Sequence, residues 1–252
     1  MSHELDISTG QAAVFVTGEP AWHKLGMVVA NAVTSAQAIE LARLNWEVEQ
    51  WELKAFDREL GKEAYVQGKY ANVRKDTGRV LGVVSEHYRI FQNRECFDFM
   101  DSLVADRLAM FESAGALKDG RVVWMLARIP AEYRAGADDV VQPYILLTNS
   151  HDGSKALRIF PTTIRVVCQN TLRRCHGPAY PFKTCLAVAR KHSAAALKPV
   201  PSRYATSSVR EGAGGLMAIY DRPAGFLTMQ GTRLTPNRAS TSRWTVSIRS
   251  LS

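Results

Sequence analysis

Three short turn segments, each between two runs of strand-forming residues, restrict this chain to folds built from β-hairpins. They lie at residues 76–78, 118–121 and 150–154, and each has an aspartate followed by a glycine within two residues. Such turns favour tight hairpins, because glycine tolerates positive φ and aspartate can bond its own backbone. Parallel strands would need crossover connections of a dozen or more residues, and the links here are too short to supply them.

The hairpin at residues 150–154 has the densest strand signal. Before it, residues 144–147 form an unbroken apolar run, which is typical of a buried strand. The return strand is predicted from about residue 155 to 167, with Pro161 as a point of interruption at a sheet edge. Alternation directs Arg165 away from its apolar neighbours, so it must reach solvent or an anionic partner.

Three helices are predicted between and after the hairpins. Residues 34–44 begin with a capping-box pattern, and residues 94–106 carry apolar side chains at helical spacing. Asn170 or Thr171 is the predicted N-cap of a short third helix. The fold class is therefore α+β, a mainly antiparallel sheet of hairpins with a few packed helices. We expect residues 45–167 to form one sheet, with helix 94–106 on one face.

Five spaced segments resemble one protein family. They read SHELDI at 2–7, PAWHKLG at 20–26, GVVSEHYRIFQN at 82–93, LLTNSHDGS at 146–154 and RVVCQNTL at 165–172. Together, over about residues 2–174, they resemble the phage/plasmid-like protein family known as domain of unknown function 932. That family has no established activity to carry over. The resemblance implies a gene of a mobile element, and a remote similarity to phage single-strand annealing proteins of the Rad fifty-two type.

The net charge of +8 is unevenly distributed along the chain. Residues 1–150 hold 16 Lys and Arg against 21 Asp and Glu, whereas residues 151–252 hold 16 against 3. Such a basic half is typical of a protein with a polyanionic partner, usually nucleic acid, although a solvated basic surface is the alternative. The predicted nucleic-acid-binding residues are Lys155, Arg158, Arg165, Arg173 and Arg174. Candidate base-stacking residues are Tyr88, Trp124 and Phe160, although each is more typical of a core.

A second candidate site is the turn that contains Asn149, His151 and Asp152. Histidine and aspartate side by side could perform acid–base chemistry, but the same residues are typical of a structural hairpin turn. The four cysteines form no C-x-x-C pair, and we predict no metal and no cofactor. We therefore favour a non-catalytic protein that binds single-stranded DNA during recombination or replication. The alternatives are an enzyme acting at this turn and an interaction protein without nucleic-acid contacts.

The end of the chain differs from the rest. Residues 1–180 form the predicted α+β domain, and residues 181–252 are basic, rich in serine and threonine, and without sustained hydrophobic periodicity. This tail is interpreted either as a disordered basic segment or as a frameshifted product of a GC-rich gene. No apolar run reaches the roughly 18 residues of a membrane span, and the N-terminus lacks a signal-peptide pattern. We expect a cytoplasmic protein of a bacterial host, and leave open its assembly into a homo-oligomer.

Overall fold

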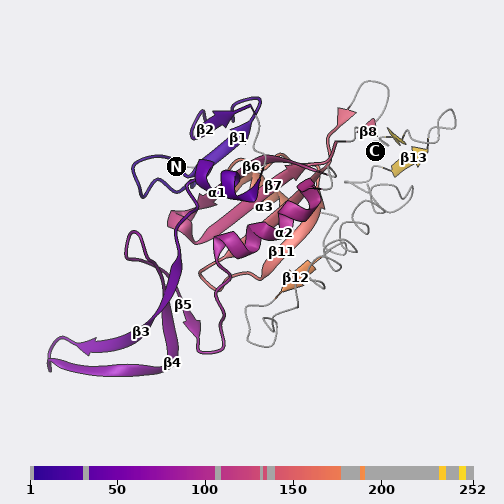
Figure 1. The fold of residues 1–252 in the computed structure, drawn as a ribbon. Helices are drawn as coiled ribbons and strands as arrows, with labels where there is room; N and C mark the ends of the chain where they lie inside the picture. The colour runs from indigo at the N-terminus through magenta and orange to yellow at the C-terminus, as the bar shows by residue number, and fades with distance from the viewer. Residues whose placement is uncertain are drawn as a thin grey trace, which may run out of the picture.

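The computed structural model describes residues 3–30, 34–105, 109–130, 133–134, 140–176, 188–190, 233–236 and 244–247. Within these residues, the chain forms one seven-stranded sheet and one three-stranded sheet, with three α-helices packed on the larger sheet (Figure 1). The predicted α+β class with mainly antiparallel pairing is confirmed.

The seven-stranded sheet forms the body of the protein. Its strands, in spatial order, are β12 (Val188–Arg190), β11 (Leu157–Thr162), β10 (Tyr144–Ser150), β7 (Val122–Arg128), β6 (Met110–Leu117), β1 (Val14–Thr17) and β2 (Met27–Val29). All neighbours in it are antiparallel except β1 and β2, which are parallel. The two predicted hairpins β6–β7 and β10–β11 lie side by side, because β7 also pairs with β10.

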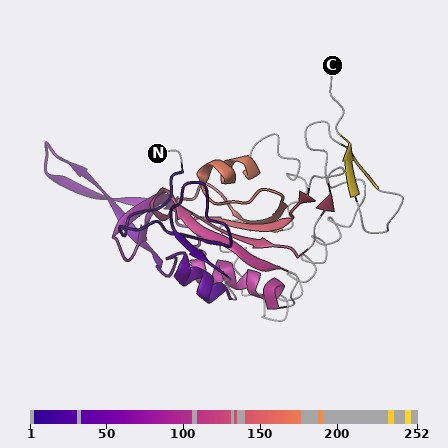
Figure 2. The same ribbon diagram turned by 90° about the horizontal axis from the view of Figure 1, so that it is seen from above.

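The three-stranded sheet consists of β3 (Val48–Asp57), β4 (Lys62–Arg74) and β5 (Arg79–Ser85). Its distal part is a two-stranded ribbon of β3 and β4 that projects from the body (Figures 1 and 2). The prediction of a single sheet over residues 45–167 is therefore wrong. A helix follows β5, so no hairpin links β5 to β6, and the sequence pattern does not reveal which strands share hydrogen bonds.

Three local boundaries also differ from the predictions. The apolar residues from Trp46 to Leu53 change face near Gln50, which predicts a bulge there, but the register shift lies between Glu52 and Lys54. Residues 56–64, predicted as a loop, continue the two strands up to a tight tip at residues 58–61. The return strand β11 ends at Thr162 instead of about residue 167, and its pairing with β12 stops at Ile159, before Pro161.

Two short pairs complete the described strands: β8 (Tyr133–Arg134) with β9 (Val140–Val141), and β13 (Arg233–Pro236) with β14 (Trp244–Ser247).

The helices cover both faces of the large sheet. They are α1 (Ser35–Leu41), α2 (Asn93–Ala105) and α3 (Gln169–His176), and a 3₁₀ turn, η1 (Lys118–Gly120), connects β6 to β7. Figure 2 shows α1 and α2 on one face and α3 on the other. The Thr34 hydroxyl accepts a hydrogen bond from the backbone N–H of Gln37, so the predicted cap of α1 is confirmed. The helix predicted at 94–106 is also confirmed, as α2.

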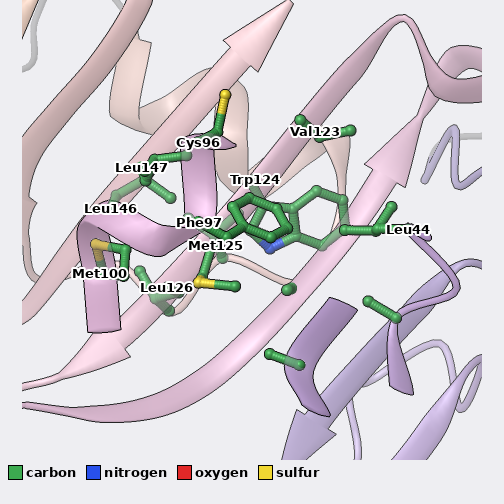
Figure 3. Packing of buried hydrophobic residues seen from close by; sticks show 14 of the residues in the cluster. Leu44, Cys96, Phe97, Met100, Val123, Trp124, Met125, Leu126, Leu146 and Leu147 are labelled. Carbon is green, nitrogen blue, oxygen red and sulfur yellow. The ribbon is translucent and has the colours of Figure 1, made fainter. Parts of the chain in front are cut away.

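The main core lies between α2 and the middle of the large sheet. Figure 3 shows Phe97 and Met100 of α2 against Met125 of β7 and Leu147 of β10. Residues 122–128 are apolar on both faces in the sequence, which predicts a central strand. Strand β7 is indeed buried on both faces, since Trp124 on its other face is also fully buried, and it is the middle strand of the sheet. Each such side chain contributes about 1.5–3 kcal/mol on burial, so this layer fixes the sheet on which the candidate sites rest.

Candidate nucleic-acid interface

The predicted turn site of Asn149, His151 and Asp152 is a buried joint between the two sheets. His151 has no solvent exposure, and its Nε2 atom lies 2.9 Å from Oδ1 of Asn93 at the start of α2. The Asn72 amide of β4 donates to the His151 carbonyl over 2.6 Å. The Asp152 side chain stabilises its own turn, because its Oδ1 accepts a hydrogen bond from the backbone N–H of Ser154. These contacts hold the three-stranded sheet against the body.

The segment at residues 82–93 forms the other half of this joint. The Asn149 amide donates to the Phe91 carbonyl at 3.1 Å, and the Tyr88 hydroxyl donates to the Ser150 carbonyl at 2.8 Å. Burial raises the pKa of Tyr88, so the hydroxyl stays a donor. A side chain at Gly82 would collide with the backbone of Asp152, since its Cβ would lie 2.6 Å from the Asp152 Cα. Two segments of the family resemblance therefore pack directly together.

Three further segments of the resemblance meet beside the start of α3. The backbone N–H of Gln169 donates to the His3 carbonyl at 3.0 Å. His23 accepts from the backbone N–H of Leu25 at Nδ1, which leaves Nε2 as the donor to the Val167 carbonyl at 3.1 Å. Burial is the main cause that lowers the pKa of His23. His23 thus holds the N-terminal segment against the start of α3, a structural role.

Arg165 does not belong with the other predicted nucleic-acid-binding residues. Its Nε atom donates to Glu112 at 2.6 Å, and its terminal nitrogen donates to the carbonyls of Thr17 and Glu19 at 2.7 and 2.9 Å. The anionic partner that an arginine in this apolar setting requires is therefore internal. The sequence contained one signal for it, because Glu112 is the only charged residue of the otherwise uncharged strand β6.

Helix α3 presents two of the predicted basic residues outward. It begins at Gln169, one to two residues before the predicted cap, and the Thr171 hydroxyl accepts from the backbone N–H groups of Val167 and Cys168. Leu172 and Cys175 are buried against the sheet. Arg173 and Arg174 are consequently exposed.

Arg158 lies beside the end of this helix. Residues 158, 160 and 162 share one face of β11, on the α3 side: the Phe160 ring lies 5.4 Å from the ring of His176, and the Thr162 hydroxyl lies 3.4 Å from the Cys175 sulfur. Cys175 is a buried free thiol whose pKa burial raises to about 11. The face of β11 that carries Arg158 is thus closed at one end by α3.

The positive charges around Arg158 lower the pKa values of neighbouring basic groups. Burial lowers the pKa of Lys155, and the positive charges of Arg158, Lys118 and Arg173 lower it further. Burial also lowers the pKa of His176, to about 4, with contributions from Lys155 and Arg158. We call Lys155, Arg158, Arg173 and His176 the basic cluster. Two of its members come from the β10–β11 hairpin and two from α3.

The cations of this region lack acidic partners. Among the described residues, the ion pairs involve other basic side chains, including the buried Arg74 with Asp6 and Arg79 with Asp119. Lys155, Arg158, Arg173 and Arg174 form none within that part of the chain. The structure therefore brings together three of the five predicted nucleic-acid-binding residues, Lys155, Arg158 and Arg173, and adds His176, which the charge pattern did not indicate. Arg174 is exposed on the same helix, α3.

The three candidate stacking residues are unavailable to bases. Tyr88, Trp124 and Phe160 are all buried in the core. Exposed aromatic side chains are found elsewhere, at Trp22 and on the projecting ribbon and its sheet. Contact with a nucleic acid at the basic cluster would thus depend on phosphate groups.

The described part of the chain has neither a metal-binding cluster nor a membrane-spanning helix. It contains no group of three or more His, Cys, Asp and Glu that could hold a metal ion, and Cys185 lies outside the described residues. None of the described helices has the length and apolar character required to cross a bilayer.

Comparison with known families gives one result. A family model described as Domain of unknown function (DUF932) matches residues 80–220, more than half of the chain. The chain belongs to the DUF932 family. The DUF932 match contains α2, the strands β6, β7, β10 and β11, and α3, so the whole basic cluster lies inside it. It also continues 40 residues past the boundary predicted at residue 180. No curated protein and no solved structure matches the chain.

Proposed function

We propose that this DUF932 protein binds single-stranded nucleic acid through the basic cluster and Arg174, without catalysing a reaction on it. The observation that carries the proposal is the group of exposed or half-buried cations that have no acidic partner in the described chain, although other arginines are paired. Phosphate groups are the natural counter-charges for such a group. Recombination or replication of a mobile element in the bacterial cytoplasm is the role that the family resemblance suggests.

The expected binding is electrostatic and tolerant of sequence. Each phosphate contact with a single strand contributes about −0.7 to the slope of log affinity against log salt, so four contacts give a slope of about −3. Affinity should then fall about 50-fold between 50 and 200 mM salt. Little base preference is expected, because the neighbouring aromatic side chains are buried.

Fluorescence anisotropy with a labelled single-stranded oligonucleotide, measured over a salt series, tests the proposal. The double variant Arg158→Ala/Arg173→Ala should bind more weakly and flatten the slope by about 1.4. The matched control is Arg94→Ala, an exposed arginine on α2, which covers the opposite face of the sheet. The absence of binding by the wild type, or equal effects of the two variants, would overturn the proposal.

The alternative of an enzyme at the Asn149–Asp152 turn has weaker support. A general acid or base must lie within hydrogen-bond reach of its substrate, and His151 is fully buried and bonded to Asn93. Assembly into a homo-oligomer stays a prediction.

A further inference from the structure

The basic cluster differs from an ordinary charged surface in how its members are held. Lys155, Arg158 and His176 are all partly buried, and Arg173 stands at the exposed rim. A flexible surface lysine or arginine loses side-chain entropy when it binds a ligand, whereas partly buried groups have already lost some of it. The cluster therefore has the preorganisation expected of a binding site.

One polar atom of the cluster lacks a partner. Nε2 of His176 is buried and makes no hydrogen bond with the described residues. A buried ring nitrogen without a partner costs about 1–3 kcal/mol, unless a ligand or water supplies the missing bond. The same ring packs edge-on against Phe160, which fixes its orientation beside the strand that carries Arg158.

The number and type of groups indicate the ligand. A phosphodiester within a strand has one negative charge, whereas a terminal phosphate has between one and a half and two charges at neutral pH and three strong acceptor oxygens, roughly the values known for phosphorylated side chains. Three cations and one ring nitrogen, contributed by two elements, match the second group better. The helix dipole does not help, since the cluster lies at the C-terminal end of α3, and the side chains must supply the attraction.

We propose that the basic cluster is a discrete site for a phosphomonoester, the terminal phosphate of a nucleic-acid strand. The inference rests on the proposed function and deepens it, because it assigns this site to a strand end instead of to any internal phosphate. In this arrangement Arg158 and Arg173 bind the phosphate oxygens from two sides, Lys155 contributes a third charge, and His176 donates from Nε2.

The charge balance around the cluster supports this assignment. Lys155 and His176 are held in an environment that disfavours positive charge, through burial first and through neighbouring cations second. Asp152 partly offsets this effect at Lys155. A bound dianion would reverse it at both residues, so phosphate binding and protonation of His176 should favour each other.

The test compares single strands of one sequence that end in a 5′-phosphate, a 3′-phosphate or hydroxyl groups only, each with its label at the other end. We expect one phosphorylated end to bind about tenfold more tightly than the hydroxyl-ended strand. His176→Asn should remove most of that difference and leave binding of the hydroxyl-ended strand nearly unchanged. Arg94→Gln is the control that should preserve the difference.

A second measurement does not depend on any variant folding. The ring signals of His176, observed by NMR of the full-length wild-type protein and assigned through their contact with the Phe160 ring, should titrate at higher pH when inorganic phosphate is added. Equal affinity for the three strands, or a His176 titration that phosphate does not shift, would overturn the inference and leave the proposed function standing. If no strand binds at low salt, the proposed function falls, and the inference falls with it.

Discussion

The Nε2 atom of His151 lies 2.9 Å from Oδ1 of Asn93, and this contact ties a hairpin turn to the first residue of α2. The two residues are 58 positions apart in the sequence. Asn93 also donates from its amide to the Leu44 carbonyl at 2.9 Å, so one side chain holds three segments in place.

Asn93→Ala should therefore destabilise the protein strongly. It leaves both the His151 ring and the Leu44 carbonyl without their buried partner, at a cost of about 1–3 kcal/mol each. Chemical denaturation monitored by tryptophan fluorescence measures the loss. Asn170→Ala is the matched control, because Asn170 is exposed, and its effect should stay within about 0.5 kcal/mol. Similar midpoints for the two variants would show that the joint is energetically unimportant.

Arg165 and Arg173 should separate stability from binding. Arg165→Ala removes the main partner of the nearly buried Glu112 and should cost about 2–4 kcal/mol, with the salt slope of oligonucleotide binding unchanged. Arg173→Ala removes an exposed charge, so it should leave stability within about 0.5 kcal/mol and flatten the slope by about 0.7. The two measurements are thermal denaturation and anisotropy. A flattened salt slope for Arg165→Ala would show that Arg165 contacts the nucleic acid.

The buried ion pair between Arg74 and Asp6 holds the N-terminal segment to β4. Both side chains are only 1% exposed, and the Arg74 guanidinium also lies over the Trp46 ring. Burial acts to raise the pKa of Asp6, but hydrogen bonds with Ser8 and Arg74 hold it below its usual value. Asp6→Ala leaves a buried charge without its buried partner and should cost about 3–5 kcal/mol.

Asp76 provides an internal control for that prediction. It also pairs with Arg74 but is 38% exposed, so Asp76→Ala should cost only about 1 kcal/mol. The measurement is the free energy of unfolding of Asp6→Ala and of Asp76→Ala, by urea denaturation at pH 7. Equal losses would mean that burial does not determine the strength of these pairs.

His176 should make stability depend on pH in a defined window. Its pKa is about 4 in the folded protein and 6.5 as a model value, so between these limits the unfolded chain binds more protons. The free energy of unfolding should thus fall as the pH drops from 7 to 5. Lys155 and Arg158 are the charged groups that act on the ring.

Thermal denaturation of wild type and His176→Asn at pH 5 and pH 7 isolates this contribution. The variant should lose less stability than the wild type over the same interval, while both retain whatever His23 contributes. An identical pH dependence would contradict a buried, neutral His176.

The sequence predicted local structure better than it predicted contacts between distant segments. The three hairpin turns, the α2 helix and the central position of β7 follow from turn chemistry and hydrophobic spacing, which are local properties. The separation into two sheets and the Arg165–Glu112 pair depend on contacts between distant segments, so no local pattern revealed them. His176 was overlooked because its burial arises only when α3 packs on β11. The predicted character of residues 181–252 lies outside the described residues, apart from β12, β13 and β14.

The ribbon of β3 and β4 has a practical consequence. Its tip at residues 58–61 is fully solvent-facing, and the backbone N–H groups of Glu59 and Leu60 are satisfied locally by Asp57. Because the tip lies far from both the core and α3 (Figures 1 and 2), an inserted epitope or fluorophore there should disturb neither folding nor the basic cluster. The tip is therefore a suitable site for attaching the protein to a surface or a label while the face that carries α3 stays free.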